Sequence, residues 1–153
     1  MVRLWDHHDS YGEVSYKNFK ILSEADNYTL SLGPLKRNEE QEKIVLNTAH
    51  DSFSIHNMAR FSTKDKDNDI SIKNRNIAAM YMTAGWFQNE NSIQSNLFGL
   101  NMNTIQTKSS WMGMSWKSFR GSRYSLRQLT MSIRPKMHIF RGKCTRQHYR
   151  LKQ

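Results

Sequence analysis

Three aspartates at alternate positions are the residues of this sequence best suited to bind a ligand through their own chemistry. Asp65, Asp67 and Asp69 fall in the polar stretch 61–69, which also contains two lysines. Clustered carboxylates repel one another unless a cation or basic neighbours compensate, and hard cations such as Ca²⁺ prefer oxygen ligands of this kind. The cluster predicts either a calcium site or an acidic turn that nearby lysines neutralise.

An EF-hand is the first calcium motif to compare with this cluster. Counted from Asp65, the position where an EF-hand needs glycine holds Ile70, and the position of its bidentate glutamate holds Asn76. The spacing therefore excludes an EF-hand.

The other reactive residues do not form a catalytic or metal-binding constellation. His7 and His8 precede Asp9, but neighbouring side chains point apart in an extended chain, and no second cluster accompanies them. The sequence has no glycine-rich phosphate loop and no nucleophile elbow. Cys144 is the only cysteine, which excludes an intramolecular disulfide and a multi-thiolate zinc site. We expect a protein that is not an enzyme.

Positive charge is concentrated in the second half of the chain. The net charge of the 153 residues is +10, and the last acidic residue is Glu90. This asymmetry favours anionic partners such as nucleic acid or sulfated glycans, or else forms a solvated basic surface without a dedicated partner. The polyanion alternative assigns binding to the tail 136–153 and to four basic residues before it: Lys117, Arg120, Arg123 and Arg127.

The elements that would position these residues begin with a hairpin over residues 16–32. Phe19 and Ile21 alternate with lysines, and Tyr28, Leu30 and Leu32 alternate with polar residues. Such a period of two predicts a pair of strands with one buried face.

From residue 51 onward the chain is rich in glycine, serine and asparagine, without long periodic runs. This pattern predicts a loop-rich region with short strands, followed by a closing strand within 124–133. The tail 136–153 has little that packs, and we expect it to be mobile. Large aromatic residues should supply much of the core: Trp86, Phe87, Trp111, Trp116 and Phe119.

Several motifs together resemble the C-terminal part of a fibrinogen C-terminal (fibrinogen-related) domain, as found in ficolins, angiopoietins and tenascins. They are Asp51-Ser-Phe-Ser-Ile-His-Asn57, Phe61-Ser-Thr-Lys-Asp-Lys-Asp-Asn-Asp69, Ser95-Asn-Leu-Phe-Gly99 and Met131-Ser-Ile-Arg-Pro135. The resemblance covers residues 4–135 and implies an α+β fold. This fold would consist of a twisted antiparallel sheet, to which residues 4–50 belong, and a loop-rich subdomain over residues 51–135 that binds calcium and ligand. The N-terminal subdomain of the family has no counterpart in this sequence.

The resemblance also implies the ligands of a calcium ion. The family supplies two carboxylates, here Asp67 and Asp69, and two backbone carbonyls, here those of Ser71 and Lys73. His56 stands in a family context in which it would make structural hydrogen bonds.

A pocket for acetylated sugars, other acetyl-bearing ligands or a peptide end is a further feature of the family. Its disulfide joins two cysteines, of which the first would fall here at Ile77 or Arg75 and the second at Ser92 or Asn91. Its histidine would fall at Ile93. Among its aromatic residues, Trp116, Phe119 and Tyr124 remain, and each of them fits a place in the core as well as in a pocket. The resemblance thus places a pocket at Ser92, Ile93, Trp116 and Tyr124, without the bridge that would brace it.

We therefore expect a non-enzymatic recognition protein, of the kind seen in innate immunity or signalling. Its ligand would be a glycan, an acetylated surface or a protein receptor, and calcium its cofactor. The alternatives are a polyanion-binding module, or a degenerate paralogue without ligand activity. The family implies an extracellular location, although the first residues lack the apolar core of a signal peptide and no apolar run reaches membrane-spanning length. Oligomers are compatible with the sequence, which contains no coiled-coil repeat.

Overall fold

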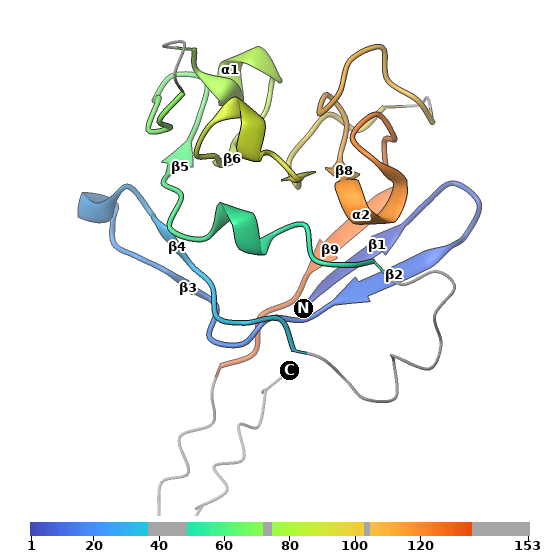
Figure 1. Ribbon diagram of the computed structural model, residues 1–153, viewed down its shortest axis with the longest axis horizontal. Helices are drawn as coiled ribbons and strands as arrows, with labels where there is room; N and C mark the ends of the chain where they lie inside the picture. Colours follow the sequence, from blue (N-terminus) through green and yellow to red (C-terminus); the bar gives the residue numbers. More distant parts are fainter. Residues whose placement is uncertain (37–48, 72–74, 103–104, 136–153) are drawn as a thin grey trace, which may run out of the picture.

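The computed structural model describes residues 1–36, 49–71, 75–102 and 105–135. Short strands and single-turn helices alternate with loops along these residues (Figure 1). In chain order the elements are β1 Val2–Trp5, β2 Tyr11–Val14, β3 Lys20–Ile21, η1 Glu24–Asp26, β4 Leu30–Ser31, η3 Ser54–His56, β5 Phe61–Ser62, α1 Ile77–Met80, β6 Gly85–Trp86, η4 Glu90–Ser92, β7 Ser95–Asn96, β8 Ser115–Trp116, α2 Lys117–Arg120 and β9 Gln128–Met131.

The largest sheet joins the two ends of the described chain. Its order is β2-β1-β9, and both pairs are antiparallel. Val2 and Leu4 of β1 are buried and alternate with half-buried neighbours, which is the pattern of a sheet with one face on the core. The predicted closing strand is confirmed as β9, although it ends before Ile133, whose side chain is 71% exposed.

The predicted hairpin is also present, with β3 and β4 paired antiparallel. Its single buried face is only partly realised, because Leu30 and Leu32 are buried whereas Ile21 and Tyr28 are 43% and 45% exposed. Asn27 and Tyr28 both have a φ of 51°, so the chain turns at these two residues. The alternation of apolar and polar residues therefore does not place the apolar side chains before and after the turn on one common face.

Aromatic residues form much of the core, as predicted. Trp86 and Trp116 are buried in the main cluster, and Phe119 packs against it from the edge. Phe87 belongs to a second, smaller cluster, against which Trp111 packs. In Figure 1 the segments that hold β5, β6, α1, β8 and α2 lie together on one side of the β2-β1-β9 sheet.

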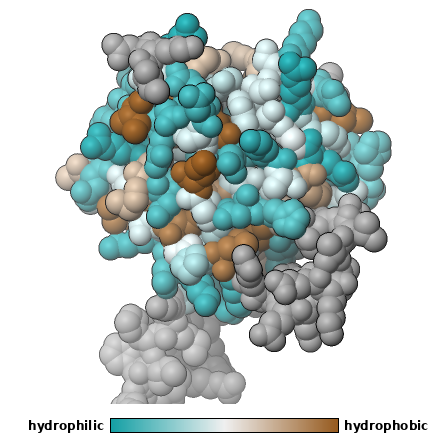
Figure 2. Space-filling model, viewed as in Figure 1, coloured by the Kyte–Doolittle hydropathy of each residue, from teal (hydrophilic) through white to brown (hydrophobic). Residues whose placement is uncertain are grey.

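The face shown in Figure 2 is mostly hydrophilic where it is coloured, with apolar side chains between the polar ones. No helix within the described ranges has the length and apolar character that a membrane span requires. The expectations for the tail 136–153, for Cys144 and for Lys73 concern residues outside the described ranges.

Candidate functional site

The loop that contains Asp65, Asp67 and Asp69, called the acidic loop below, follows β5 and is held largely by hydrogen bonds between side chains and backbone. Asn68 donates its side-chain amide to the carbonyl of Phe61, at 2.6 Å, and its backbone N–H to Ser62 Oγ, at 3.0 Å. From the other side, the Asn76 side chain donates to the carbonyl of Thr63, at 2.9 Å. Asn68 thus fastens the loop to β5, and Asn76 fastens it to the residue that follows β5, so the loop that contains the three aspartates is held in a defined conformation.

The three aspartates play different roles within this loop. Asp69 accepts hydrogen bonds from the backbone N–H groups of Ser71 and Ile77, both at 2.9 Å. Asp67 accepts one from the backbone N–H of Asp69, at 3.1 Å. Asp65 is exposed, and its carboxylate accepts a hydrogen bond of 2.8 Å from the hydroxyl of Thr63.

The pKa values of Asp69 and Asp65 are shifted in opposite directions. Burial raises the pKa of Asp69, and the adjacent charge of Asp67 raises it further, against the opposing effect of the hydrogen bonds from Ile77 and Ser71. The hydrogen bond from Thr63 lowers the pKa of Asp65. Asp67 and Asp69 are therefore the pair whose mutual repulsion a bound cation would relieve.

The donor set fits a hard cation only if backbone oxygens contribute. Among the described residues, no three side chains of His, Cys, Asp or Glu come together as a metal site. Two carboxylates can be supplemented by carbonyls, which Ca²⁺ accepts readily. The carbonyl of Ser71 lies in the described part of the loop, and the Ser71 hydroxyl donates to the Glu90 carboxylate in η4. The resemblance assigns the further carbonyl to Lys73, outside the described residues.

Ser92 and Ile93, two of the predicted pocket residues, have structural roles. The Ser92 hydroxyl donates to the carbonyl of Asn89 and accepts from its N–H, which caps η4. Ile93 is buried in the smaller cluster together with Ile77 and Phe87. Isoleucines at 77 and 93 thus contribute apolar packing in the region where the resemblance would place a disulfide.

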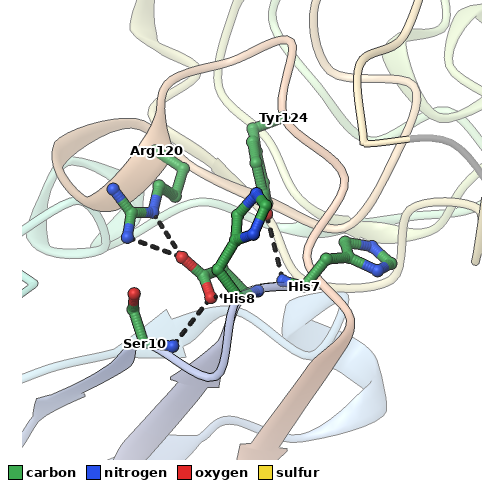
Figure 3. Close-up of polar contacts among 6 residues, drawn as sticks. His7, His8, Ser10, Arg120 and Tyr124 are labelled. Carbon is green, nitrogen blue, oxygen red and sulfur yellow. Dashed lines mark hydrogen bonds and ion pairs between the residues drawn. The ribbon is translucent and has the colours of Figure 1, made fainter.

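Trp116 and Tyr124, the other two, are also engaged elsewhere. Trp116 is fully buried, and its indole N–H donates to the carbonyl of His50, at 2.8 Å. The Tyr124 hydroxyl accepts a hydrogen bond from the backbone N–H of His7, at 3.0 Å (Figure 3). Trp116 is therefore a core residue and not part of a pocket surface, and Tyr124 closes the turn that follows β1.

Two of the four predicted polyanion-binding residues form ion pairs with the turn between β1 and β2. Arg120 pairs with Asp6, and Arg127 lies 2.7 Å from the carboxylate of Asp9. Lys117 and Arg123 are exposed, and within the described ranges neither belongs to an ion pair.

Asp6 is the most buried carboxylate of this region. Its Oδ1 accepts from the backbone N–H groups of His8 and Ser10, both at 2.8 Å, and its Oδ2 accepts from Arg120 (Figure 3). Burial alone would raise the pKa of Asp6, but the hydrogen bonds from Ser10, His8 and Arg120 together hold it below its usual value.

The sequence did not predict an aromatic cluster beside the acidic loop, in which one of three rings is exposed. Phe61, at the start of β5, meets Trp86 with ring centroids 5.1 Å apart, and Phe98 lies 6.2 Å from both. Phe98 is 48% exposed. Both phenylalanines occur in the motifs that carry the family resemblance, but only the pairing of β5 with β6 brings residue 61 to residue 86.

Comparison with known proteins connects this arrangement to a described family. Residues 1–136 match the family of the C-terminal globular domain of fibrinogen beta and gamma chains. Angiopoietin-related protein 7 of Mus musculus is 32% identical over 131 residues, which are 86% of this chain and 34% of that protein. Angiopoietin-related protein 6 of Homo sapiens is 34% identical over 136 residues, which are 88% of this chain and 26% of that protein.

Solved structures agree with this assignment. The fibrinogen-like globe domain of human ANGPTL6 matches with a TM-score of 0.70 and 31% identity, over 84% of this chain and 52% of that chain. Lamprey fibrin D-dimer, solved with the peptide Gly-His-Arg-Pro-amide, matches with a TM-score of 0.66 over 94% of this chain and 49% of that chain. At 18% identity the lamprey protein supports the fold alone.

These matches confirm the predicted α+β fibrinogen-like fold. The chain spans roughly a quarter to a third of the length of the curated relatives, and about half of the solved chains. The angiopoietin-related relatives are non-enzymatic binding proteins, which agrees with the expectation that the chain is not an enzyme. The chain belongs to the family of fibrinogen C-terminal globular domains.

Proposed function

We propose that this chain is a recognition module that binds a protein receptor through Phe98, the exposed ring of this aromatic cluster, with a calcium ion bound in the adjacent acidic loop. The observation that carries the proposal is the position of Phe98, half exposed over the rings of Phe61 and Trp86. Aromatic side chains at the centre of a surface patch contribute a large share of the binding energy in protein interfaces. Similarity to angiopoietin-related proteins supports a signalling role.

A protein partner fits the site better than an acetylated glycan. The glycan hypothesis depends on a pocket at residues 92, 93, 116 and 124, whose side chains cap a helix, fill the core or close a turn. An exposed aromatic ring provides contact area but few of the convergent polar groups that orient a sugar.

The polyanion alternative is weakened by the ion pairs of its basic residues. Arg120 and Arg127 are each paired with an aspartate, so binding a phosphate or sulfate would require replacement of an existing partner. Lys117 and Arg123 would attract a polyanion whatever its sequence, and salt would weaken this attraction.

Calcium would act on the aromatic cluster through the loop. Asp67 and Asp69 would contribute carboxylate oxygens and Ser71 a carbonyl oxygen. The loop is hydrogen-bonded to the backbone of Phe61 through Asn68, so a cation that stiffens the loop would also hold the Phe61 ring. Two carboxylates with carbonyls make a weak to moderate site, which suits the millimolar calcium of the extracellular space. We accordingly assign the protein to that compartment.

The proposal is tested by binding of the labelled chain to cultured human cells. We expect saturable binding that disappears when the cells are treated with trypsin and that survives heparinase and excess N-acetylglucosamine. Phe98→Ala should weaken binding at least tenfold, because it removes the exposed ring, while Tyr11→Ala should leave binding within twofold. Tyr11 is a matched control, since it is 42% exposed and lies on β2.

Each of the other results contradicts the receptor proposal in a specific way. Loss of binding after heparinase would instead identify a polyanion ligand, and competition by N-acetylglucosamine would identify an acetylated glycan. Equal weakening by Phe98→Ala and Tyr11→Ala would show that the aromatic cluster is not the contact surface.

A further inference from the structure

The turn between β3 and β4 contains a three-residue pattern that the proposed receptor contact does not use. In Asn27-Tyr28-Thr29 an asparagine is followed, after one residue other than proline, by threonine, and no other triplet of the 153 residues has this form. The pattern is the acceptor of N-linked oligosaccharides in proteins that pass through the secretory pathway. Because so short a pattern also arises by chance, its place in the fold decides whether it can carry a glycan.

The triplet lies at the tip of the β3–β4 hairpin, which projects at the left of the molecule in Figure 1. The residues of the tip before Asn27 are exposed, from Ser23 to Asp26, and Tyr28 is 45% exposed. An N-linked glycan is bulky and hydrated, so it needs an exposed turn with open solvent around it. The tip of this hairpin meets that requirement.

The side-chain amide of Asn27 is the group that would be modified, and the fold leaves it free. Within the described residues it takes part in no hydrogen bond or ion pair. Asn27 has a φ of 51° and a ψ of 40° and ends η1, and asparagine tolerates this left-handed conformation well. Several other asparagines instead use their side-chain amides to hold the fold: Asn57, Asn68, Asn76, Asn89 and Asn96.

Thr29, whose hydroxyl completes the pattern, is in the opposite situation. It is 7% exposed, and its hydroxyl donates to the carbonyl of Asp26, at 2.5 Å. The backbone around it is closed as well, since the N–H of Tyr28 donates to the carbonyl of Ser23 and the N–H of Leu22 donates to the carbonyl of Thr29. A transferase that must bind the threonine hydroxyl therefore has no access to it once the hairpin has formed.

We propose that Asn27 carries an N-linked oligosaccharide, which is attached before the β3–β4 hairpin closes. In the transfer, Nδ2 of Asn27 forms a bond to the anomeric carbon of the first sugar of a lipid-linked diphospho-oligosaccharide. The bond from that carbon to the diphosphate breaks, and the lipid diphosphate leaves with the electron pair. Nδ2 gives up one proton to a base of the transferase, and nothing is oxidised or reduced. The modification rests on the extracellular location proposed for the chain and goes beyond the receptor contact.

The attachment point lies next to the aromatic cluster. The carbonyl of Asn27 accepts a hydrogen bond from the N–H of Phe61, at 3.0 Å, and the indole N–H of Trp86 donates to the carbonyl of Tyr28, at 2.9 Å. A glycan on Asn27 therefore borders, on the side of the hairpin, the cluster to which Phe98 belongs.

The test is expression of the full chain in cultured human cells behind a cleavable secretion leader, which supplies the route to the transferase. We expect a shift in gel mobility that peptide N-glycosidase removes. This enzyme leaves aspartate in place of the modified asparagine, and mass spectrometry should detect it in the tryptic peptide 21–36, whose only asparagine is Asn27. Asn27→Asp should abolish the shift without disturbing the turn, because aspartate also tolerates a left-handed backbone.

Matched substitutions separate the pattern from its surroundings. Thr29→Ser keeps a hydroxyl and the acceptor pattern, so it should keep the shift, whereas Thr29→Ala should abolish it. Asn18→Asp is the control. Asn18 is exposed and also has a positive φ, of 53°, but Phe19 and Lys20 follow it, so the shift should be unchanged.

The order of attachment and folding has its own measurement. The full chain is produced in bacteria, folded, and incubated with solubilised transferase and the lipid-linked donor. We expect no modification of this folded chain, while the same preparation modifies a standard acceptor peptide. The chain with its leader should be modified when it is translated in the presence of microsomes.

Distinct outcomes would overturn the two parts of the proposal. An unshifted wild-type chain, or a shift that survives Asn27→Asp, would exclude the glycan. Recovery of the glycosylated chain only as aggregates, while the Asn27→Asp chain is folded, would show that the fold does not accommodate it. Equal modification of the folded and the nascent chain would overturn the order of events. None of these measurements involves receptor binding, so a negative result leaves the Phe98 contact standing, and loss of that contact leaves the shift unchanged.

Discussion

Arg120 Nη2 lies 2.5 Å from Asp6 Oδ2 and joins two residues that are 114 positions apart in the chain. Asp6 follows β1 and is fully buried, whereas Arg120 ends α2 and keeps a third of its side chain exposed. The pair therefore ties the loop-rich region to the main sheet. Because the same carboxylate also accepts two backbone N–H groups, it organises the turn between β1 and β2 as well.

Asp6→Ala should lower the free energy of unfolding by about 3 kcal/mol, as expected when one member of a buried, hydrogen-bonded ion pair is removed. Urea denaturation at pH 7 provides the measurement. The folded-state pKa of Asp6 lies below its ordinary value, so the contribution of Asp6 is complete above the unfolded pKa and declines as the pH falls through the folded one.

Asp9→Ala is the control for this substitution. Asp9 pairs with Arg127, but its side chain is 79% exposed, and exposed pairs contribute about 1 kcal/mol or less. A loss for Asp6→Ala that is no larger than the loss for Asp9→Ala would show that burial of the pair does not matter.

Asp67→Asn should affect stability in opposite directions with and without calcium. In EDTA the substitution removes repulsion from Asp69, whose pKa is raised by burial and by Asp67, and the melting temperature should stay level or rise slightly. Its amide oxygen can still accept the hydrogen bond from the Asp69 N–H. In millimolar Ca²⁺ the wild-type melting temperature should rise, and that rise should be lost in the variant.

Differential scanning fluorimetry with matched EDTA and calcium samples measures this reversal. Asp65→Asn is the control, since Asp65 is exposed and bonded to Thr63, and it should retain most of the calcium-induced rise. A wild-type protein with no shift in millimolar Ca²⁺ would refute the calcium site.

His56 should make stability depend on pH between about 4 and 6.5. Burial lowers the pKa of His56 to about 4, although the hydrogen bond to the carbonyl of Trp86 opposes this effect. Between these values the unfolded chain binds a proton that the folded chain does not, so stability rises with pH across this window. The contribution is about 3 kcal/mol and is complete above the unfolded pKa.

Urea unfolding at half-unit steps from pH 4.5 to 7.5 measures this slope, and His56→Gln should flatten it whatever its effect on absolute stability. A variant with the same slope as wild type would mean that His56 is not the group responsible. The ring is held neutral by its surroundings, because Nδ1 donates to Trp86 while Nε2 accepts from the N–H groups of Gln94 and Ser95.

Local patterns in the sequence predicted the elements better than their bounds. Alternation identified the hairpin and the closing strand, because a period of two reports which residues face a core. It misjudged Ile21, Tyr28 and Ile133, which are exposed. Two residues with positive φ interrupt the hairpin. An apolar residue at the end of a strand is buried only if another segment packs against it, and the sequence of that strand alone does not show which segment will.

The candidate site could also be predicted only in part from the sequence. The cluster of Asp65, Asp67 and Asp69 could be found from spacing, since residues two apart lie within one loop, whereas the choice of Asp67 and Asp69 as the calcium pair came from the family resemblance. The aromatic cluster could not, because Phe61, Trp86 and Phe98 meet only through pairing of short strands with little periodicity. Trp116 looked equally suited to a pocket and a core until its complete burial was known.

By itself, the sequence determined the family, the α+β fold and the acidic loop, because those depend on residues that are neighbours or are joined by local turns. Only the tertiary structure decided what each side chain is free to do. It paired Arg120 with Asp6 and Arg127 with Asp9, and left Phe98 half exposed. A side chain can bind a partner only through the surface that remains accessible after distant segments have packed against it. A local pattern of residues does not show how much surface that is.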